Sequence, residues 1–133
     1  MVNYNKIKNF TDLIVWQYAH QLTLAIYEVT KSFPKGEMYS LVDQMRRCSI
    51  SVTSNIAEGF SRSTRNDKLH FYFMSKGSMT ELQNQLILAK DLGYIAQELF
   101  DSLYERTIVI LKLLNKFISV TENRIIQEQE RGI

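Results

Sequence analysis

The sequence predicts an all-α fold, an antiparallel up-down-up-down four-helix bundle, on three observations. Apolar residues recur at three- and four-residue spacing along four long segments, which is the period of an amphipathic helix. One proline and five glycines in 133 residues leave these segments with few breakers. Short links separate the segments, and short links place consecutive helices side by side in opposite directions. We expect a single domain, residues 1–133, whose core needs no disulfide or metal.

The first helix is expected over about residues 12–32, with Thr11 or Asp12 as its cap. The stripe expected to face the core contains Val15, Tyr18, Leu22, Ala25, Ile26, Val29 and Phe33. A second apolar stripe follows the opposite face and contains Leu13, Trp16, His20, Leu24 and Tyr27. Two apolar faces indicate burial on two sides, and Trp and Tyr are favoured at interfaces. We interpret the second stripe as an oligomer interface; partial exposure in a monomer is the alternative.

The second helix is expected over about residues 37–59, after the break formed by Pro34 and Gly36. Its apolar stripe is Leu41, Met45, Cys48, Val52 and Ile56, and a polar stripe beside it contains Gln44, Arg47, Ser51, Asn55, Glu58 and Arg62. Ile50 and Ala57 lie roughly opposite the apolar stripe. Because a solvent-facing side would be polar, these two residues are assigned to the same oligomer interface.

The third and fourth helices are expected over about residues 65–92 and 96–126. Thr64 with Asp67 resembles a capping box at the start of the third helix, and Gly93 fits its end. The third core stripe is Phe71, Met74, Ser75, Ser78, Leu82, Leu86, Ala89 and Leu92. The fourth is Leu99, Phe100, Leu103, Thr107, Ile110, Leu114, Phe117, Ile118, Thr121 and Ile125. The polar residues 127–133 are expected to fray.

Basic charge is concentrated in the middle of the chain. The whole chain has a net charge of +2, whereas residues 44–76 carry six basic and two acidic side chains, a net of +4. The candidate nucleic-acid contacts are Arg46, Arg47, Arg62, Arg65, Lys68 and Lys76. They fit either a phosphate-contacting patch or an ordinary solvated face. Base stacking is a secondary possibility at Tyr72 or Phe73.

Candidate chemistry is sparse. Cys48, the one cysteine, lies on an apolar stripe, which favours a core residue in a reducing compartment. No run approaches the roughly 18 apolar residues of a membrane span, so a cytoplasmic protein without membrane contact is expected. Two histidines do not supply the paired Glu-x-x-His motifs of a carboxylate-bridged metal site, so no metal site and no cofactor are expected. The polar cluster of Gln44, Ser51, Asn55, Glu58 and Glu81 permits a general base at Glu58. A structural role is favoured, and no catalytic residue is assigned.

Motifs along residues 10–120 carry a family resemblance. They are Phe10, Asp12-Leu13, Trp16, Phe33-Pro34, Glu37, Tyr39, Leu41, Gln44-x-Arg46-Arg47, Ser51, Asn55-Ile56-Ala57-Glu58-Gly59, Gly77-Ser78, Glu81-Leu82 and Leu92-Gly93-Tyr94. The chain resembles the four-helix-bundle proteins encoded in intervening sequences of bacterial large-subunit ribosomal RNA genes, sometimes labelled ribosomal proteins. It is also similar to accessory proteins of diversity-generating retroelements. The resemblance implies a homo-oligomer, a ring of five bundles, and no known enzyme activity. The retroelement relatives imply nucleic-acid binding and contact with a reverse transcriptase.

The leading hypothesis is therefore a non-enzymatic, ring-forming helical bundle that interacts with RNA or a ribonucleoprotein through basic residues of the second helix and the junction that follows it. The alternative is a protein–protein interaction scaffold with no nucleic-acid role, whose basic stretch serves its own subunit contacts. An enzyme using Asn55 and Glu58 is a third possibility. The position of the basic residues on the folded chain distinguishes the first two.

Overall fold

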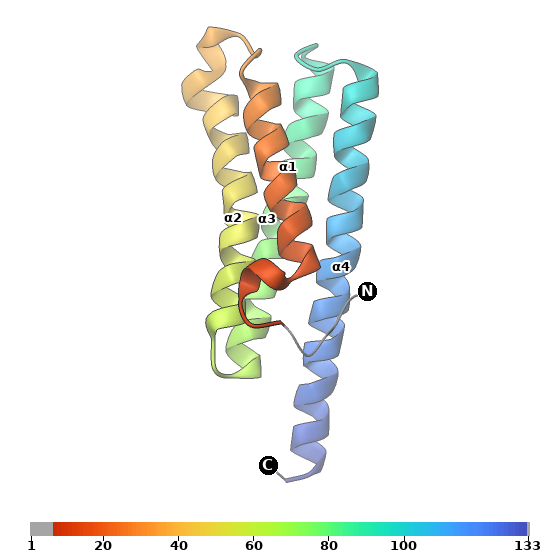
Figure 1. Ribbon diagram of the computed structural model, residues 1–133. Coiled ribbons are helices and arrows are strands. Elements are labelled where there is room, and N and C mark those ends of the chain that lie inside the picture. The colour runs from red at the N-terminus through yellow and green to blue at the C-terminus, as the bar shows by residue number, and fades with distance from the viewer. Residues whose placement is uncertain (1–6, 133) are drawn as a thin grey trace.

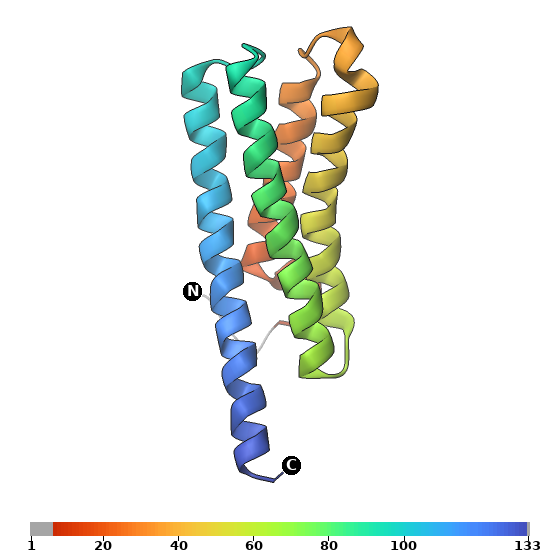
Figure 2. The same cartoon turned by 180° about the vertical axis from the view of Figure 1, so that it is seen from behind.

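The structure, a computed structural model, describes residues 7–132 and contains helices without any strand in that range. Four α-helices dominate: α1 (Ile14–Thr30), α2 (Asp43–Ser61), α3 (Arg65–Asp91) and α4 (Gln97–Glu130) (Figure 1). α2 packs against α1 on one side and α3 on the other, while α4 contacts α3 and, less extensively, α1. Figure 2 shows α3 and α4 side by side along the back of the bundle. The expected all-α class is confirmed.

The chain enters α1 through a short 3₁₀ turn, Phe10–Asp12, which begins after Asn9. The Asp12 carboxylate accepts hydrogen bonds from the backbone N–H groups of Lys8 (2.9 Å) and Asn9 (3.2 Å). Asp12 is therefore occupied by the preceding turn and does not cap α1 as expected. Leu13 stands at the N-cap with an extended backbone, and α1 begins at Ile14, about two residues later than the sequence indicated.

The start of α2 is irregular. A 3₁₀ turn, Lys35–Glu37, leads into a π-helical turn, Met38–Val42, and regular α-helix follows from Asp43. The Glu37 N–H donates to the Pro34 carbonyl oxygen at 2.9 Å, which starts this turn immediately after the proline. At its other end α2 continues to Ser61, because Gly59 keeps a helical backbone where α2 meets α3. The 3₁₀ turn, the π-helical turn and α2 together cover the range 37–59 expected for the second helix.

The boundaries of α3 match the sequence closely. Thr64 Oγ1 accepts a hydrogen bond from the Asp67 N–H at 3.2 Å, so Thr64 is the N-cap. At the other end Gly93 adopts a φ of +81°. That conformation lets the Tyr94 N–H donate to the Ala89 carbonyl oxygen at 2.9 Å, which closes the helix.

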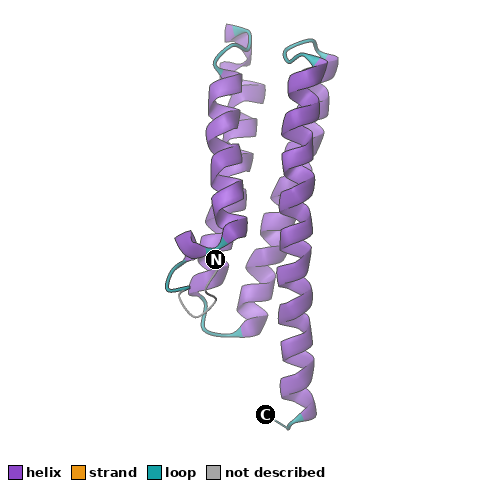
Figure 3. Cartoon of the chain, turned by 45° about the vertical axis from the view of Figure 1, so that its right-hand side comes forward, coloured by secondary structure: helices purple, strands orange, loops and turns teal. Residues whose placement is uncertain are grey.

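The end of α4 was predicted wrongly. The helix continues to Glu130 instead of ending near residue 126, and Figure 3 shows its last turns extending beyond the rest of the bundle. A contact with α3 explains the extension. Arg65 Nε lies 2.6 Å from Glu128 Oε1, so the last turns are joined to the start of α3. Polar composition indicated fraying, but composition carries no information on this long-range ion pair.

The core draws on all four helices. Its most completely buried large side chains are Val15, Leu22, Ile26, Val42, Met45, Val52, Ile56, Met79, Leu82, Leu86, Ile110 and Leu114. The whole predicted stripe of α2 is buried, and most of the α4 stripe is too. The stripes of α1, α3 and α4 include errors, because Tyr18, Met74, Leu92 and Leu99 are exposed. Ala19, Thr30 and Met79 are buried instead, so the buried face of each helix is turned slightly from the face expected.

Candidate interaction surfaces

The outer side of the α1–α2 pair carries most of the residues predicted as an oligomer interface. α1 lies against α2 here, with Thr23 Oγ1 donating to the Ser49 carbonyl oxygen at 3.3 Å. We call this group the outer apolar face: Trp16, His20, Leu24 and Tyr27 from α1, with Ile50 and Ala57 from α2; Trp16 and Ala57 are half-buried and the others exposed. Leu24, Ile50 and Tyr27 are 57%, 41% and 37% exposed. The fold therefore brings the two predicted groups to one side of the molecule.

Aromatic rings organise one end of this face. Trp16 stacks on His20 with ring centroids 4.7 Å apart and planes 10° apart. Phe10, which the sequence reasoning left out of this face, meets Trp16 edge-on at 5.3 Å. Its sequence signals were its place just ahead of the helix and its place among the family motifs. The assignment of Leu13 to the oligomer interface was wrong, because Leu13 is 5% exposed and lies in the core of its own chain. As the extended N-cap residue it does not follow the helical spacing that grouped it with Trp16.

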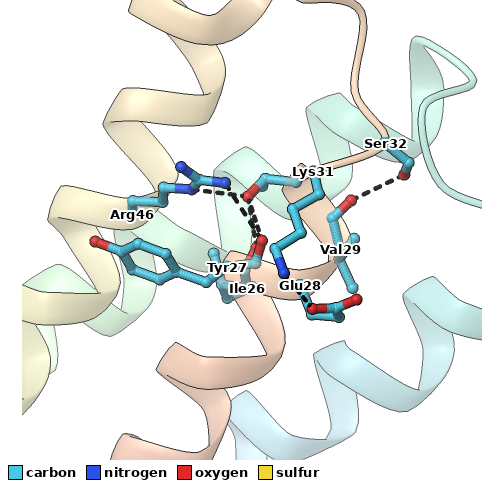
Figure 4. A network of polar contacts seen from close by, with 8 residues as sticks. Ile26, Tyr27, Glu28, Val29, Lys31, Ser32 and Arg46 are labelled. Atoms are coloured by element: carbon cyan, nitrogen blue, oxygen red, sulfur yellow. Dashed lines mark hydrogen bonds and ion pairs between the residues drawn. The ribbon is translucent and has the colours of Figure 1, made fainter.

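Arg46 lies at the other end of the face and reaches from α2 to α1 (Figure 4). Its Nε donates to Thr30 Oγ1 at 3.0 Å and its Nη2 to the Tyr27 carbonyl oxygen at 3.3 Å. The guanidinium also lies 4.6 Å from the centroid of the Tyr27 ring. A cation next to the last carbonyl groups of α1 is favoured by the helix dipole. Arg46 therefore joins two helices of its own chain, and is only partly free for a phosphate.

The other predicted basic residues are dispersed. Arg47 pairs with Asp43 at 2.9 Å on the exposed side of α2. Arg62 pairs with Glu58 at 3.1 Å, its guanidinium 4.5 Å from the Phe71 ring, and Arg65 pairs with Glu128. Lys76 lies farther along α3. The structure thus does not gather the six into one surface.

Three of them do meet at the α2–α3 junction, which we call the junction corner: Arg62, Arg65 and Lys68. Lys68 Nζ donates to the carbonyl oxygens of Phe60 (2.7 Å) and Gly59 (3.3 Å), the last turn of α2. Burial lowers the pKa of Lys68, and the positive charge of Arg65 lowers it further. The second cause indicates that the two cations act on each other at this corner.

The predicted polar cluster lies along α2 and its seam with α3, and two of its members, Ser51 and Asn55, bond to each other. Ser51 Oγ and Ser78 Oγ are 2.8 Å apart across the seam. Asn55 Nδ2 donates to the Ser51 carbonyl oxygen (2.8 Å) and to Ser51 Oγ (3.1 Å). Glu58 is turned to Arg62 instead. The arrangement favours the structural interpretation of Asn55 and Glu58, because each is used within α2 or across the seam.

A shallow open hollow of about 210 Å³ lies farther along the same seam. It is lined by Gln44, Arg47, Cys48, Ser51, Ser78 and Glu81, so three members of the polar cluster do meet there. Cys48 Sγ donates to the Ser78 carbonyl oxygen at 2.9 Å. Burial, and then the charge of Glu81, raises the pKa of the Cys48 thiol to about 12. The thiol is therefore protonated at neutral pH and a poor nucleophile.

Of the two aromatic residues considered for base stacking, the structure leaves only one available. Tyr72 is 5% exposed, packs against Phe117 with ring centroids 5.6 Å apart, and has a pKa raised by burial. Phe73 is 45% exposed. Among residues 7–132, no group of three or more His, Cys, Asp or Glu side chains is placed to hold a metal ion. In the same part of the chain, no helix is both long and apolar enough to span a membrane.

Comparison with known proteins gives one family and one fold. A family model described as 23S rRNA-intervening sequence protein matches residues 11–116. The crystal structure of a protein of unknown function from the S23 ribosomal protein family of Bacteroides thetaiotaomicron is similar, with a TM-score of 0.74. The match is 21% identical in sequence and covers 80% of this chain and 96% of that one. At this identity the likeness shows a shared fold. No curated protein matches the chain.

Proposed function

Because the chain belongs to the family of 23S rRNA-intervening sequence proteins, we propose that it is a non-enzymatic helical bundle that assembles with copies of itself and contacts RNA or a ribonucleoprotein. In this proposal the four helices run alternately up and down, and five copies form a ring. Neither membership of the family nor the fold specifies a function. The support for this proposal therefore comes from the surfaces of the chain.

The outer apolar face is the observation that carries the proposal. Leu24, Tyr27 and Ile50 are large apolar side chains exposed on neighbouring helices, beside the stacked pair of Trp16 and His20. A contiguous apolar surface of this kind is typical of a protein–protein contact. In a closed ring of more than two subunits each contact joins two different surfaces of neighbouring copies. The face would then pack on another side of the next copy.

The RNA part of the proposal draws support from the junction corner. Each copy would contribute one such corner, and repetition around a ring turns a modest charge into a stronger local field. Contacts would be made chiefly to phosphates, so they would depend little on base sequence and steeply on salt.

A non-enzymatic role is supported by the surroundings of the candidate nucleophile, Cys48, and of the candidate general base, Glu58. The Cys48 thiol is buried, with a pKa of about 12. Glu58, the one candidate general base, pairs with Arg62, and Asn55 hydrogen-bonds back to Ser51 instead of holding Glu58. The proposal therefore assigns these side chains to the packing of α2.

Two measurements on the wild-type protein test the proposal. Light scattering at micromolar concentration should give the mass of an oligomer, and a monomer would overturn the assembly. Fluorescence anisotropy with a labelled single-stranded RNA should give binding near 50 mM salt that weakens by several orders of magnitude near 200 mM, as expected for multiple phosphate contacts. An oligomer without RNA binding at low salt would overturn the RNA part.

One observation favours the alternative, a protein scaffold. Five of the six predicted basic side chains form hydrogen bonds or ion pairs within their own chain. The double substitution Arg62→Glu with Arg65→Glu distinguishes the two roles. Weaker RNA binding by an intact oligomer supports the RNA role. Loss of the assembly would identify these arginines as structural residues of a scaffold.

A further inference from the structure

The middle of the α3–α4 pair carries basic residues and no acidic ones. Residues 68–80 of α3 and residues 107–121 of α4 contain neither Asp nor Glu. The basic residues of these two stretches are Lys68, Lys76, Lys112 and Lys116. Acidic residues return on both sides, as Asp67 and Glu81 on α3 and Glu105 and Glu122 on α4. Exposed helices usually carry both acidic and basic side chains at i, i+4 spacing. A stretch with basic residues alone is therefore distinct from the rest of the surface.

The packing of α3 on α4 places three of these lysines at one level of the bundle. Gln83 Nε2 donates to Thr107 Oγ1 at 2.9 Å, and the rings of Tyr72 and Phe117 lie 5.6 Å apart. Both contacts give the same register, in which residue numbers rise along α4 as they fall along α3. Lys76 therefore lies level with Leu114, midway between Lys112 and Lys116 on the neighbouring helix. Lys112 and Lys116 are one turn apart, about 6 Å along the axis.

These lysines differ from the arginines of the junction corner in their ion pairs within the chain. Among the described residues, no carboxylate lies within 4 Å of the ammonium groups of Lys76, Lys112 or Lys116. Lys112 and Lys116 are exposed, and Lys76 is half-buried at the seam. Arg62 and Arg65 each pair with a carboxylate of their own chain. A phosphate can approach the lysines without displacing an internal partner, whereas at the corner it competes with Glu58 and Glu128.

An exposed aromatic ring borders the lysines. Phe73 lies three residues before Lys76, so the two are neighbours on the surface of α3, and its side chain is 45% exposed. Aromatic rings beside a basic track are a platform on which unpaired bases stack, and such stacking tolerates any base. A duplex offers no free base face along its length. The combination therefore fits a single strand better than a duplex.

We propose that Phe73, Lys76, Lys112 and Lys116, here called the lysine band, form the surface that holds single-stranded RNA, and that the junction corner is not the principal contact. Lysines of the two helices neutralise phosphates at one level of the bundle, and Phe73 stacks on a base. The proposal rests on the RNA-binding part of the proposed function. It assigns that binding to α3 and α4, the two helices nearest the viewer in Figure 2.

Anisotropy with labelled oligouridine over a range of salt concentrations tests the lysine band. The triple variant Lys76→Gln, Lys112→Gln, Lys116→Gln should bind at least about tenfold more weakly at low salt. Its log-affinity against log-salt slope should fall by roughly 2, at about 0.7 for each lost single-strand phosphate contact. The comparison variant, Arg62→Gln with Arg65→Gln, should weaken binding less than the triple variant does, because both arginines already pair with carboxylates of their own chain. The double variant Lys112→Gln with Lys116→Gln, both exposed, repeats the test without touching half-buried Lys76.

The outcomes separate this inference from the proposed function. If the wild-type protein does not bind oligouridine, the RNA-binding part of the proposed function is itself contradicted. Wild-type binding that the arginine variant loses and the lysine variants keep overturns the lysine band and leaves the function standing. Circular dichroism and light scattering confirm that each variant keeps its fold and mass.

Phe73→Leu tests the choice of a single strand. It should weaken oligouridine binding while leaving the salt slope unchanged, because a stacking contact releases no counterions. Binding to heparin, a polyanion without bases, should be unaffected. Equal oligouridine affinity of Phe73→Leu and wild type would overturn the stacking assignment and make the band a surface for any polyanion, acidic proteins included.

Discussion

Tyr72 of α3 lies directly against Gly59 of α2. A Cβ atom on Gly59 would stand 2.6 Å from Cε1 of the Tyr72 ring and 3.2 Å from Cβ of Phe71. The absence of a side chain at residue 59 is what lets α2 and α3 approach so closely near their junction. Tyr72 is buried here, and its neighbour Phe71 is half-buried.

Replacing Gly59 with Ala should destabilise the fold. The added methyl group overlaps a buried ring, and overpacking of this kind costs about 1–3 kcal/mol. Gly77→Ala is the matched control, because nothing lies within 4 Å of its Cβ position in α3. It should stabilise by about 0.5–1 kcal/mol through helix propensity. Urea unfolding of both variants gives the comparison, and changes of the same sign would contradict the close contact.

Leu82 should be among the most costly residues to truncate. Its side chain is completely buried in the core, and Leu82→Ala is expected to lower the free energy of unfolding by about 2–5 kcal/mol. Leu88→Ala, on the same helix but 47% exposed, provides the control and should cost little. Similar costs for the two variants in denaturant unfolding would show that the core face of α3 is misplaced.

Trp16→Glu should dissociate the assembly or make it insoluble, because it buries a carboxylate in the outer apolar face. Tyr39→Glu is the control, since Tyr39 is 94% exposed on the π-helical turn outside that face. Light scattering of the two variants at equal concentration measures the effect. An oligomer of wild-type mass in Trp16→Glu would remove this face from the subunit contact.

The pKa of Cys48 predicts a loss of stability in alkali. Burial raises the pKa from 9.0 to about 12, so the folded state holds a proton that the unfolded state releases first. Stability from this group is complete below pH 9 and falls as the pH rises from 9 towards 12. Urea unfolding at pH 7 and pH 10.5 should show a larger decrease in wild type than in Cys48→Ala. Equal decreases would assign the effect to other groups.

Glu128→Gln should loosen the last turns of α4 without destabilising the bundle. The Arg65–Glu128 pair is partly exposed, and pairs of that kind contribute about 0.2–1 kcal/mol to stability. Its effect is local, because it joins turns that extend beyond the bundle. Amide hydrogen exchange should therefore quicken at residues 125–130 while exchange in the core is unchanged. Unaltered exchange near Glu128 would mean that the tail is held in another way.

Periodicity predicted the core face well where one face of a helix is apolar and less well where two are. α2 has a well-defined boundary between apolar and polar stripes, and all five residues assigned to its core face are buried. α1 has apolar residues around most of its circumference, so spacing alone placed Tyr18 inside and left Ala19 out. The choice between such neighbours depends on which one meets a partner helix.

The interaction surfaces were predicted in part. Both halves of the outer apolar face came from helical spacing, with Leu13 as the one misplaced member. The charge count over residues 44–76 was right, but it grouped residues by sequence position. Asp43 and Glu58 are partners four residues away on the same helix. The other partners, Thr30, Glu128 and three backbone carbonyls, are fixed by the way the helices pack. Lys112 and Lys116 were not among the predicted basic contacts, because they lie far along the chain from Lys76.

The sequence by itself determined the helices and most of their ends, because spacing, caps such as Thr64 and breakers such as Gly93 act within a few residues. Only the tertiary structure decided which charges are free. An ion pair such as Arg65 with Glu128 joins residues that are distant in sequence, and it forms because α3 and α4 pack in one register. The same register brings Lys76 level with Lys112 and Lys116. Local chemistry fixes each helix, whereas the surface that a partner meets depends on contacts between helices.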